Sequence, residues 1–598
     1  MRSKLFKVFV LVIAASMLLS ACATATQAPA VVEKTVIVAG TPQTVVVTAT
    51  PGPAAAKPAV LRVNLGSYPD VVDPQKSSFV NEIAHLEMFY EGLTRLNAKL
   101  ETVPGAAEKW EYNADATELT FTIRKDLKYS DGSVLNAKRF EYSLLRNIDP
   151  ATAGEYSSIT DEISGAPEWR GADLSVATAD ELAALKAAVK VQALDSTGAP
   201  CADYEQADCL TLKLGLSKPA PYFHTVMSLW VTFPAKEENI SAGGEQWWNS
   251  SKWQIGNGPF ILQSLEPFVR GYFVPNPNYW GDKPAYDLEY RYITDSAVSF
   301  EAYKNNEFDI VPLAAEDLKT VQADADLSKQ AMIYPGACTY NLNFHQLKEP
   351  FTDKAVREAF SYAIDREGWV TDVLKGLGAP TLTWIPKGFP GYDAEETRFA
   401  YDPAKAKQVL ADAGYTVENG ILVKDGKQFP ITFTFSDTPR NRTRYDWLAS
   451  KWKEDLGLAV ALDPVEATTY TALTKDVSTA PQTFILGWCA DYPDPQNWLS
   501  VYWKSTSGFA ARIAYVNPAF DELVNAADVE LDVAKRADLY MQAQKELVSS
   551  IPGVFFWNNV NTYLVKPWVK GISQTPQDSG FAGEKAPTTI TIDTSMIP

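Results

Sequence analysis

Histidine is scarce in this chain: among 598 residues there are three, His85, His224 and His345, and no two lie within one helical turn. That supply suits neither a zinc site built on histidines nor a Ser-His-Asp triad. The patterns GxxxxGK[ST], HExxH and GxSxG are missing as well. We therefore expect no enzyme activity, no metal site and no cofactor.

Positive charge is also in short supply, with 54 Lys and Arg against 73 Asp and Glu and a net charge of −19. An acidic chain is poorly suited to nucleic acids or anionic lipid surfaces. We expect no nucleic-acid partner.

Apart from the N-terminus, the sequence has no long apolar run of the kind that spans a membrane. Residues 1–21 combine the basic Arg2, Lys4 and Lys7 with an apolar run from Val8 to Leu19 and a small-residue exit. This pattern predicts a secretory signal peptide, and hence an extracytoplasmic location.

The residues after the signal predict an anchor and a tether. Leu19 to Cys22, LSAC, resembles a bacterial lipobox, which implies acylation of Cys22 and attachment to a membrane surface through lipid. Residues 22–58 are rich in Ala, Thr, Val and Pro and cannot bury a core, so we expect a flexible tether. The Val/Thr alternation from Thr35 to Thr48 fits a strand, although Gly40 and Pro42 interrupt it.

The cysteines are few enough to count. With Cys22 assigned to lipid, four remain, and four cysteines allow three pairings. Cys201 and Cys209 flank a short polar excursion between two alternating runs, so a local bridge closing a hairpin loop is the simplest choice. Cys338 and Cys489 are then either a second bridge or two free buried thiols.

Strand and helix patterns alternate along the rest of the chain. Residues 119–123 alternate between apolar and polar side chains, as in a half-buried strand. Asp353, Asp402-Pro403 and Asn517-Pro518 each precede a run with helical spacing, and Gly414 ends the second of these. This alternation predicts an α/β protein with several lobes.

One stretch poses a chemical question: FILGWCADYPDPQNWL, residues 484–499. Asp491 stands at the end of an apolar, aromatic strand, where an unpaired carboxylate is costly. Asp491 therefore needs a partner.

Motifs spaced along the whole mature chain resemble the large extracytoplasmic solute-binding proteins of ATP-binding-cassette (ABC) importers, in the peptide/nickel-binding family (family 5). The matching segments, in family order, are YPDVVDP (68–74), YEGL (90–93), LTFTIRKDLKYSDGSVLNAKRFEYS (119–143), GNGPF (256–260), NPNYW (276–280), PFTDKAVREAFSYAIDRE (350–367) and YDPAKAKQVLADAGY (401–415).

The resemblance implies a two-lobed periplasmic-binding-protein-like fold (type II, large three-domain form) with mixed sheets and a ligand cleft between lobes that close by a hinge. By the family pattern, lobe I is discontinuous, residues 92–215 form an inserted domain II, and residues 338–560 form lobe II. The segments of lobe I are 59–91, 216–337 and 561–598.

Within the family, residues 484–499 are similar to the oligopeptide-binding subgroup. There, the run matching Trp488, Cys489, Ala490 and Asp491 carries the aspartate that pairs with the α-amino group of a bound peptide. Its cysteine pairs with one in a Cys-Thr-Tyr run, which implies a Cys338–Cys489 bridge here. By position in the motifs, Tyr156 matches a tyrosine that contacts the peptide backbone, and Val80 matches a strand-pairing position.

The chain departs from the subgroup at three positions. Ser78 replaces a glutamate, Asn341 replaces a tyrosine, and Ile485 replaces an arginine of the kind that meets the peptide's C-terminal carboxylate. The candidate replacements for that arginine are Arg440, Arg442 and Arg444, although a solvated charge cluster is the simpler interpretation of these three.

The resulting hypothesis is a monomeric, lipid-anchored receptor that binds oligopeptides and delivers them to the permease subunits and ATPases of an ABC importer. An oligosaccharide or another solute is the alternative ligand, since the sixteen tryptophans offer stacking platforms. A surface hydrolase with Asp491 and Asp494 as paired acids is the second alternative, but Pro493 and Pro495 favour a turn-stabilising role for Asp494.

Overall fold

The computed structural model describes residues 59–598, together with the backbone of residues 31–38 and 41–48. The predicted signal peptide and Cys22 lie outside the described residues. Residues 1–58 and 59–598 form two separate compact units, and each is treated by itself.

In the first unit, two strands pair within the segment expected to be a tether. β1 (Val31–Val38) and β2 (Thr41–Thr48) are antiparallel, with Val38 opposite Thr41. Gly40 lies outside the described residues. Pro42 is opposite Ile37, and a two-stranded sheet tolerates this proline because both of its strands are edges.

The second unit is organised by a mixed sheet of eleven described strands. Ten follow one another in the order β10-β11-β12-β3-β13-β22-β14-β21-β19-β20, and β15 (Ala379–Pro380) pairs with β22. Their bounds are β10 (Phe260–Glu266), β11 (Arg270–Pro275), β12 (Tyr286–Arg291), β3 (Ala59–Asn64), β13 (Ile310–Pro312), β22 (Gly553–Val565), β14 (Ala331–Phe344), β21 (Thr483–Cys489), β19 (Thr432–Ser436) and β20 (Ala461–Val465).

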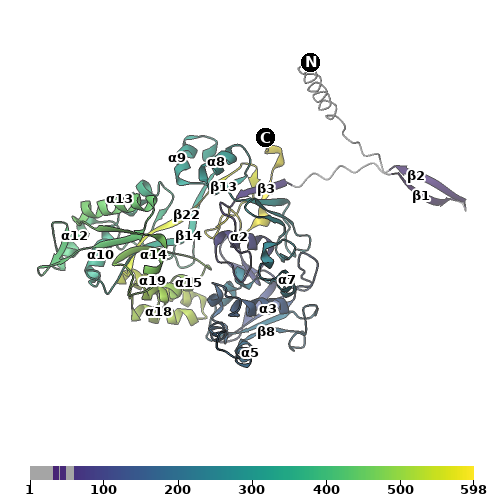
Figure 1. Cartoon of the computed structure of the whole chain (residues 1–598), viewed down its shortest axis with the longest axis horizontal. Helices are drawn as coiled ribbons and strands as arrows, with labels where there is room; N and C mark the ends of the chain where they lie inside the picture. Colours follow the sequence, from purple (N-terminus) through teal and green to yellow (C-terminus); the bar gives the residue numbers. More distant parts are fainter. Residues whose placement is uncertain (1–30, 39–40, 49–58) are drawn as a thin grey trace, which may run out of the picture. The chain divides into compact units, whose positions relative to one another are not determined.

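β14 and β22 are the long strands at the middle of this sheet. Figure 1 shows them between α10, α12 and α13 on one side and α2 and α3 on the other. The predicted lobe boundaries, 337/338 and 560/561, fall inside these two strands. Their pairing shifts register between Pro335 and Thr339, beside the first of those boundaries.

Buried apolar side chains gather on either side of these strands. One core draws mainly on residues 61–334 and the C-terminal segment, and two others draw mainly on residues 342–557. Two residues cross this division: Tyr492 packs in the first core, and Leu100 packs in the third. The two halves of the second unit therefore touch.

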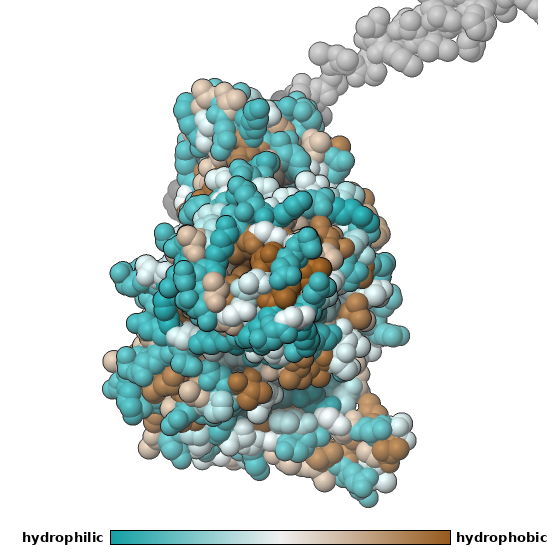
Figure 2. Space-filling view, turned by 90° about the vertical axis from the view of Figure 1, so that its left-hand side faces the viewer, coloured by the Kyte–Doolittle hydropathy of each residue, from teal (hydrophilic) through white to brown (hydrophobic). Residues whose placement is uncertain are grey.

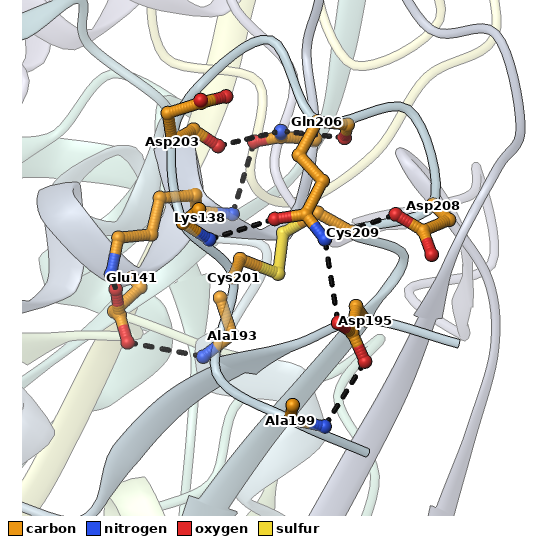
Figure 3. The surroundings of a disulfide bond; sticks show 12 residues. Lys138, Glu141, Ala193, Asp195, Ala199, Cys201, Asp203, Gln206, Asp208 and Cys209 are labelled. Atoms are coloured by element: carbon orange, nitrogen blue, oxygen red, sulfur yellow. Dashed lines mark hydrogen bonds and ion pairs between the residues drawn. A yellow bond between two sulfur atoms is a disulfide. The ribbon is translucent and has the colours of Figure 1, made fainter. Parts of the chain in front are cut away.

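A second sheet, β6-β7-β9-β8, lies within the predicted inserted domain. Its strands are β6 (Ala107–Tyr112), β7 (Glu118–Ile123), β8 (Val191–Leu194) and β9 (Thr211–Gly215). The loop between β8 and β9 is closed by the predicted Cys201–Cys209 disulfide, which is confirmed. Figure 3 shows Gln206 inside this loop, its amide directed at Asp195 and Asp208.

The helices begin where the sequence signals predicted. Asp353, Asp402 and Asn517 cap the first turns of α10, α12 and α18 through their side chains. Within the described residues, the helices of seven or more residues are α2 (Val80–Phe89), α3 (Ala137–Ile148), α5 (Ala179–Ala188), α7 (Glu237–Gly243), α8 (Ser296–Lys304), α9 (Ala315–Ala323), α10 (Lys354–Tyr362), α12 (Pro403–Asp412), α13 (Pro439–Leu456), α14 (Ala467–Leu473), α18 (Pro518–Val529) and α19 (Val533–Ser550).

None of the helices within the described residues is long and apolar enough to cross a bilayer. The face seen in Figure 2 is mostly hydrophilic, with hydrophobic residues confined to separate patches. Such a surface fits the net charge of −19.

Candidate ligand-binding site

A cavity of about 880 Å³ lies between the two halves of the second unit. Most of the residues predicted for the ligand site line it: Ser78, Val80, Tyr156, Trp488, Cys489, Ala490 and Asp491. They come from three distant segments of the chain, which the fold brings together around one space.

Asp491 has no cationic partner among the described residues. Its Oδ2 accepts a hydrogen bond from the Nδ2 of Asn497 at 2.9 Å. Burial raises the pKa of the Asp491 carboxyl to about 6, and the Asn497 hydrogen bond opposes that rise. The carboxylate is therefore an unmatched negative charge in the cavity wall.

Asn497 holds this corner of the cavity together. It lies in α15 (Pro495–Trp498), and its Oδ1 accepts from the Trp488 indole at 3.1 Å and from the Asp491 backbone N–H at 3.2 Å. One amide side chain thus fixes both Trp488 and Asp491.

The strand that leads to Asp491 has a free edge. β21 pairs with β14 along its whole length, but with β19 only at Thr483 and Phe484. From Ile485 to Cys489, that second edge has no strand partner within the described part of the chain. At Gly487, a Cβ would lie 2.7 Å from the Tyr340 ring, so glycine is needed for this close approach.

The opposite wall of the cavity carries Tyr156. Its ring packs edge-on against Trp230 at 5.0 Å, and Trp230 donates to the Ser77 carbonyl at 2.8 Å. Burial, together with the negative charges of Asp491 and Glu155, raises the pKa of Tyr156 to about 12. Asp491 therefore lies close to the Tyr156 phenol across the cavity.

Two predicted positions differ from expectation. Asn341 lies outside the cavity: it is fully buried in β14 and donates to Asn343 at 2.8 Å. Side chains alternate along a strand, so Asn341 faces away from the side occupied by Tyr340. Val80 lines the cavity, but as the first residue of helix α2 and not as part of a strand.

The three arginines separate into two groups. Arg440 is an exposed residue 3.6 Å from Glu316, and Arg442 pairs with Asp437 at 2.6 Å. Neither lines a cavity described here, which agrees with a solvated cluster for these two.

Arg444 behaves differently, because it lines a second cavity of about 430 Å³. This cavity shares Gly487 and Asn559 with the first one. Burial lowers the pKa of the Arg444 guanidinium, and no acidic side chain pairs with it among the described residues. An unmatched cation thus lies beyond the free edge of β21, at the other end from Asp491.

Contacts next to Asp491 join the two halves of the second unit. Tyr492 stacks on Tyr222 with ring centroids 6.4 Å apart and planes 5° apart. Arg536 lies 5.5 Å from the Tyr222 ring and pairs with Asp494 at 2.7 Å. Asp494 also caps α15 through the Gln496 N–H, so its carboxylate has a structural role.

The predicted Cys338–Cys489 disulfide is confirmed. It joins β14 to β21 at a pair of directly opposed residues, and both cysteines line the main cavity. The described residues contain no group of three or more His, Cys, Asp or Glu placed to hold a metal ion.

Several residues of the cavity were not predicted from sequence, among them Asn497, Glu155 and Tyr222. Asn497 had a visible signal, because Asp494-Pro495 predicts a helix start three residues before it. Glu155 directly precedes the predicted Tyr156. Tyr222 had no signal beyond its aromatic side chain.

The cavity and the fold define a class of protein, and the comparisons agree. The family model of bacterial extracellular solute-binding proteins, family 5, matches residues 101–510, which is more than half of the chain. The chain belongs to this family. The predicted family and the predicted α/β, two-lobed fold class are thereby confirmed.

Among curated proteins, the chain is similar to the periplasmic murein peptide-binding protein MppA of Escherichia coli K12, 28% identical over 86% of this chain and 90% of that protein. It is also 28% identical to the periplasmic oligopeptide-binding protein OppA of the same organism, over 87% and 90%. A solved structure of MppA, in an unliganded open form, shares 25% identity and a TM-score of 0.73, covering 90% of this chain and 98% of that one.

Proposed function

We propose that this protein is a lipid-anchored extracytoplasmic receptor that binds oligopeptides between two closing lobes and delivers them to an ABC importer. The observation that carries the proposal is the unmatched Asp491 carboxylate beside the free edge of β21, inside a cavity of about 880 Å³. The peptide-binding relatives support the same ligand class.

The α-ammonium of the peptide binds Asp491 in this proposal. Burial penalises the negative charge of the Asp491 carboxylate, and a cation beside it offsets that penalty. Binding of the ammonium therefore lowers the pKa of Asp491. Removing one member of such a buried pair costs about 2 to 5 kcal/mol.

The peptide backbone then adds as a strand to β21. The free edge from Leu486 to Cys489 offers backbone groups to an extended chain without selecting its side chains, whereas the Ile485 carbonyl already accepts from the Tyr470 hydroxyl. Trp488 and Tyr156 flank the bound strand from the two sides of the cavity.

Arg444 receives the C-terminal carboxylate of peptides long enough to reach it. The path along the chain from Asp491 back to Ile485 in β21 spans about 20 Å in an extended chain. Ile485 lines the second cavity together with Arg444, so an extended peptide of about five or six residues covers this path.

Closure, anchoring and delivery complete the proposal. The two lobes, whose predicted boundaries fall within β14 and β22, close on the ligand by a hinge in these strands. Cys22 carries the lipid, and the monomeric receptor meets the permease subunits of the importer.

The cavity fits an oligosaccharide less well than a peptide. Six of the sixteen tryptophans have an exposed fraction below 2%, and two others, Trp230 and Trp488, line the main cavity. Both of these donate their indole N–H to the protein itself. A neutral sugar also leaves Asp491 without a counter-charge.

Native mass spectrometry of the chain from residue 23 onward tests the ligand class. Denaturing the isolated receptor should release a mixture of short peptides, whereas hexose-spaced masses would support the sugar alternative.

Binding titrations of peptides then test the proposed contact between Asp491 and the peptide α-ammonium. Asp491→Asn should weaken a peptide with a free N-terminus about 30-fold or more and leave its N-acetylated form unaffected. Asp282→Asn, an exposed site outside the cavity, is the control. Equal affinity of the wild type for free and acetylated peptides would refute the assignment of Asp491.

A further inference from the structure

The loop that follows α3 carries a carboxylate without a partner. Glu155 is exposed and lines the main cavity. No described residue forms a hydrogen bond or an ion pair with its side chain. Two acidic neighbours on the same wall differ, since Asp161 pairs with Arg170 at 2.6 Å and Glu162 with Lys218 at 3.2 Å.

This loop is held firmly in place. A Cβ on Gly154 would lie 2.1 Å from the backbone oxygen of Gln75, so only glycine allows the loop to approach so closely. Gln75 is itself fixed, because it donates to the carbonyls of Val231 and Phe233 at 3.1 Å and accepts from Arg146 at 2.6 Å. The backbone of Glu155 is therefore anchored at the cavity wall.

Glu155 directly precedes Tyr156 in the chain, and Glu155, Tyr156 and Asp491 all line the main cavity. The negative charges of Glu155 and Asp491 raise the pKa of Tyr156, whose hydroxyl makes no hydrogen bond with the described residues. One carboxylate comes from each half of the second unit, and both residues line the main cavity, in which the proposed peptide N-terminus binds.

The basic residues of the cavity wall do not neutralise this pair. Lys585 is 2.5 Å from Glu87, and Arg95 is an exposed residue that donates to the Pro104 carbonyl at 3.3 Å. The carboxylates of Glu155 and Asp491 are therefore best matched by a ligand that carries two positive charges at its N-terminal end. A single amino acid supplies both when it is an N-terminal lysine or arginine.

We propose that Glu155 makes this receptor selective for peptides whose first residue is lysine or arginine, with the α-ammonium on Asp491 and the cationic side chain on Glu155. This inference rests on the proposed function, because it assumes that Asp491 binds the N-terminus. Glu155 would then determine side-chain specificity in a site that otherwise recognises the backbone and the termini of the peptide.

The test compares two peptides that differ by one charge, Lys-Ala-Ala-Ala and its norleucine analogue, by calorimetric titration. The wild type should bind the lysine peptide about fivefold more tightly, the upper end of what a solvent-accessible ion pair contributes, and less so at high salt. Glu155→Gln should bring the ratio to about 1 with the norleucine affinity unchanged. Glu168→Gln, an exposed glutamate of the same domain outside the cavity, should keep the ratio.

The possible failures are distinguishable. A wild type that binds both peptides equally, or a ratio that survives Glu155→Gln, would overturn the selectivity while leaving the receptor function intact. Asp491→Asn should weaken both peptides by the same factor, and a ratio that collapses there instead would assign the selectivity to Asp491. Binding of neither peptide to the wild type would overturn the proposed function and this inference together.

Discussion

The side-chain amide of Asn497 lies 2.9 Å from the Asp491 carboxylate that it holds, and its oxygen accepts from the Trp488 indole at 3.1 Å. This hydrogen bond is the interaction that opposes the effect of burial on the pKa of Asp491. Asn497 is therefore a positioning residue for the proposed ammonium site.

Replacing Asn497 should move the pH dependence of peptide binding. In the wild type, affinity should fall below about pH 6, roughly tenfold per pH unit, because the protonated Asp491 carries no charge for the ammonium. In Asn497→Ala the pKa of Asp491 rises further, so the fall should begin at a higher pH. Titrations between pH 5 and 8 measure this midpoint, with Asn113→Ala, outside the cavity, as the control. The same midpoint in both variants would contradict the role of Asn497.

Asp491→Asn should stabilise the empty receptor at pH 7.5. The folded-state pKa of about 6 lies above the ordinary value of 3.8, so the folded chain retains a proton that the unfolded chain releases between about pH 4 and 6. Ionisation in this window lowers the free energy of unfolding, and asparagine removes that penalty. Thermal unfolding should show a higher Tm for the variant at pH 7.5 and little difference at pH 4. A lower Tm at pH 7.5 would mean that Asp491 is already paired.

Arg444→Ala should remove discrimination between a peptide acid and its amide. The wild type should prefer the free carboxylate of a five- or six-residue peptide by about tenfold, as for a hydrogen bond to a charged group. Arg442→Ala is the matched control, since Arg442 lies on the same helix but is paired with Asp437. Preference for the acid that persists in Arg444→Ala would place the carboxylate elsewhere.

The two disulfides should differ in their contribution to stability. Cys338 and Cys489 are 151 residues apart and Cys201 and Cys209 are 8 apart, so loop-closure entropy predicts a loss about twice as large for the first pair. Denaturant unfolding of the paired Cys→Ser variants measures both losses. Peptide affinity should fall with the first pair alone, because those cysteines line the cavity. Equal losses of stability would show that native-state contacts, and not loop length, dominate.

Local signals in the sequence predicted much of the fold. The caps at Asp353, Asp402 and Asn517 depend on neighbours within one turn, and the hairpin around Cys201 and Cys209 depends on two adjacent strands. Such short-range chemistry is visible in the order of residues alone. The family motifs supplied the long-range Cys338–Cys489 pair, which is confirmed.

The errors and omissions at the site share one physical cause. Whether Asn341 faces the cavity depends on which side of β14 the ligand space lies, and a one-residue change reverses the answer. Arg442 and Arg444 are two residues apart on one helix, and packing of the second unit decides which of them is left without an acidic partner. Asn497 acquires its role only when α15 folds back onto β21.

Formation of the Cys338–Cys489 disulfide depends on the compartment in which the chain folds. Thiols stay reduced in a bacterial cytoplasm, and disulfides form after export. A chain that has not left the cytoplasm therefore lacks the crosslink between β14 and β21 in the wall that carries Trp488 and Asp491. In the proposed extracytoplasmic location, the oxidising compartment completes the binding wall, so the proposed receptor would be fully assembled only on the side of the membrane where its ligands arrive.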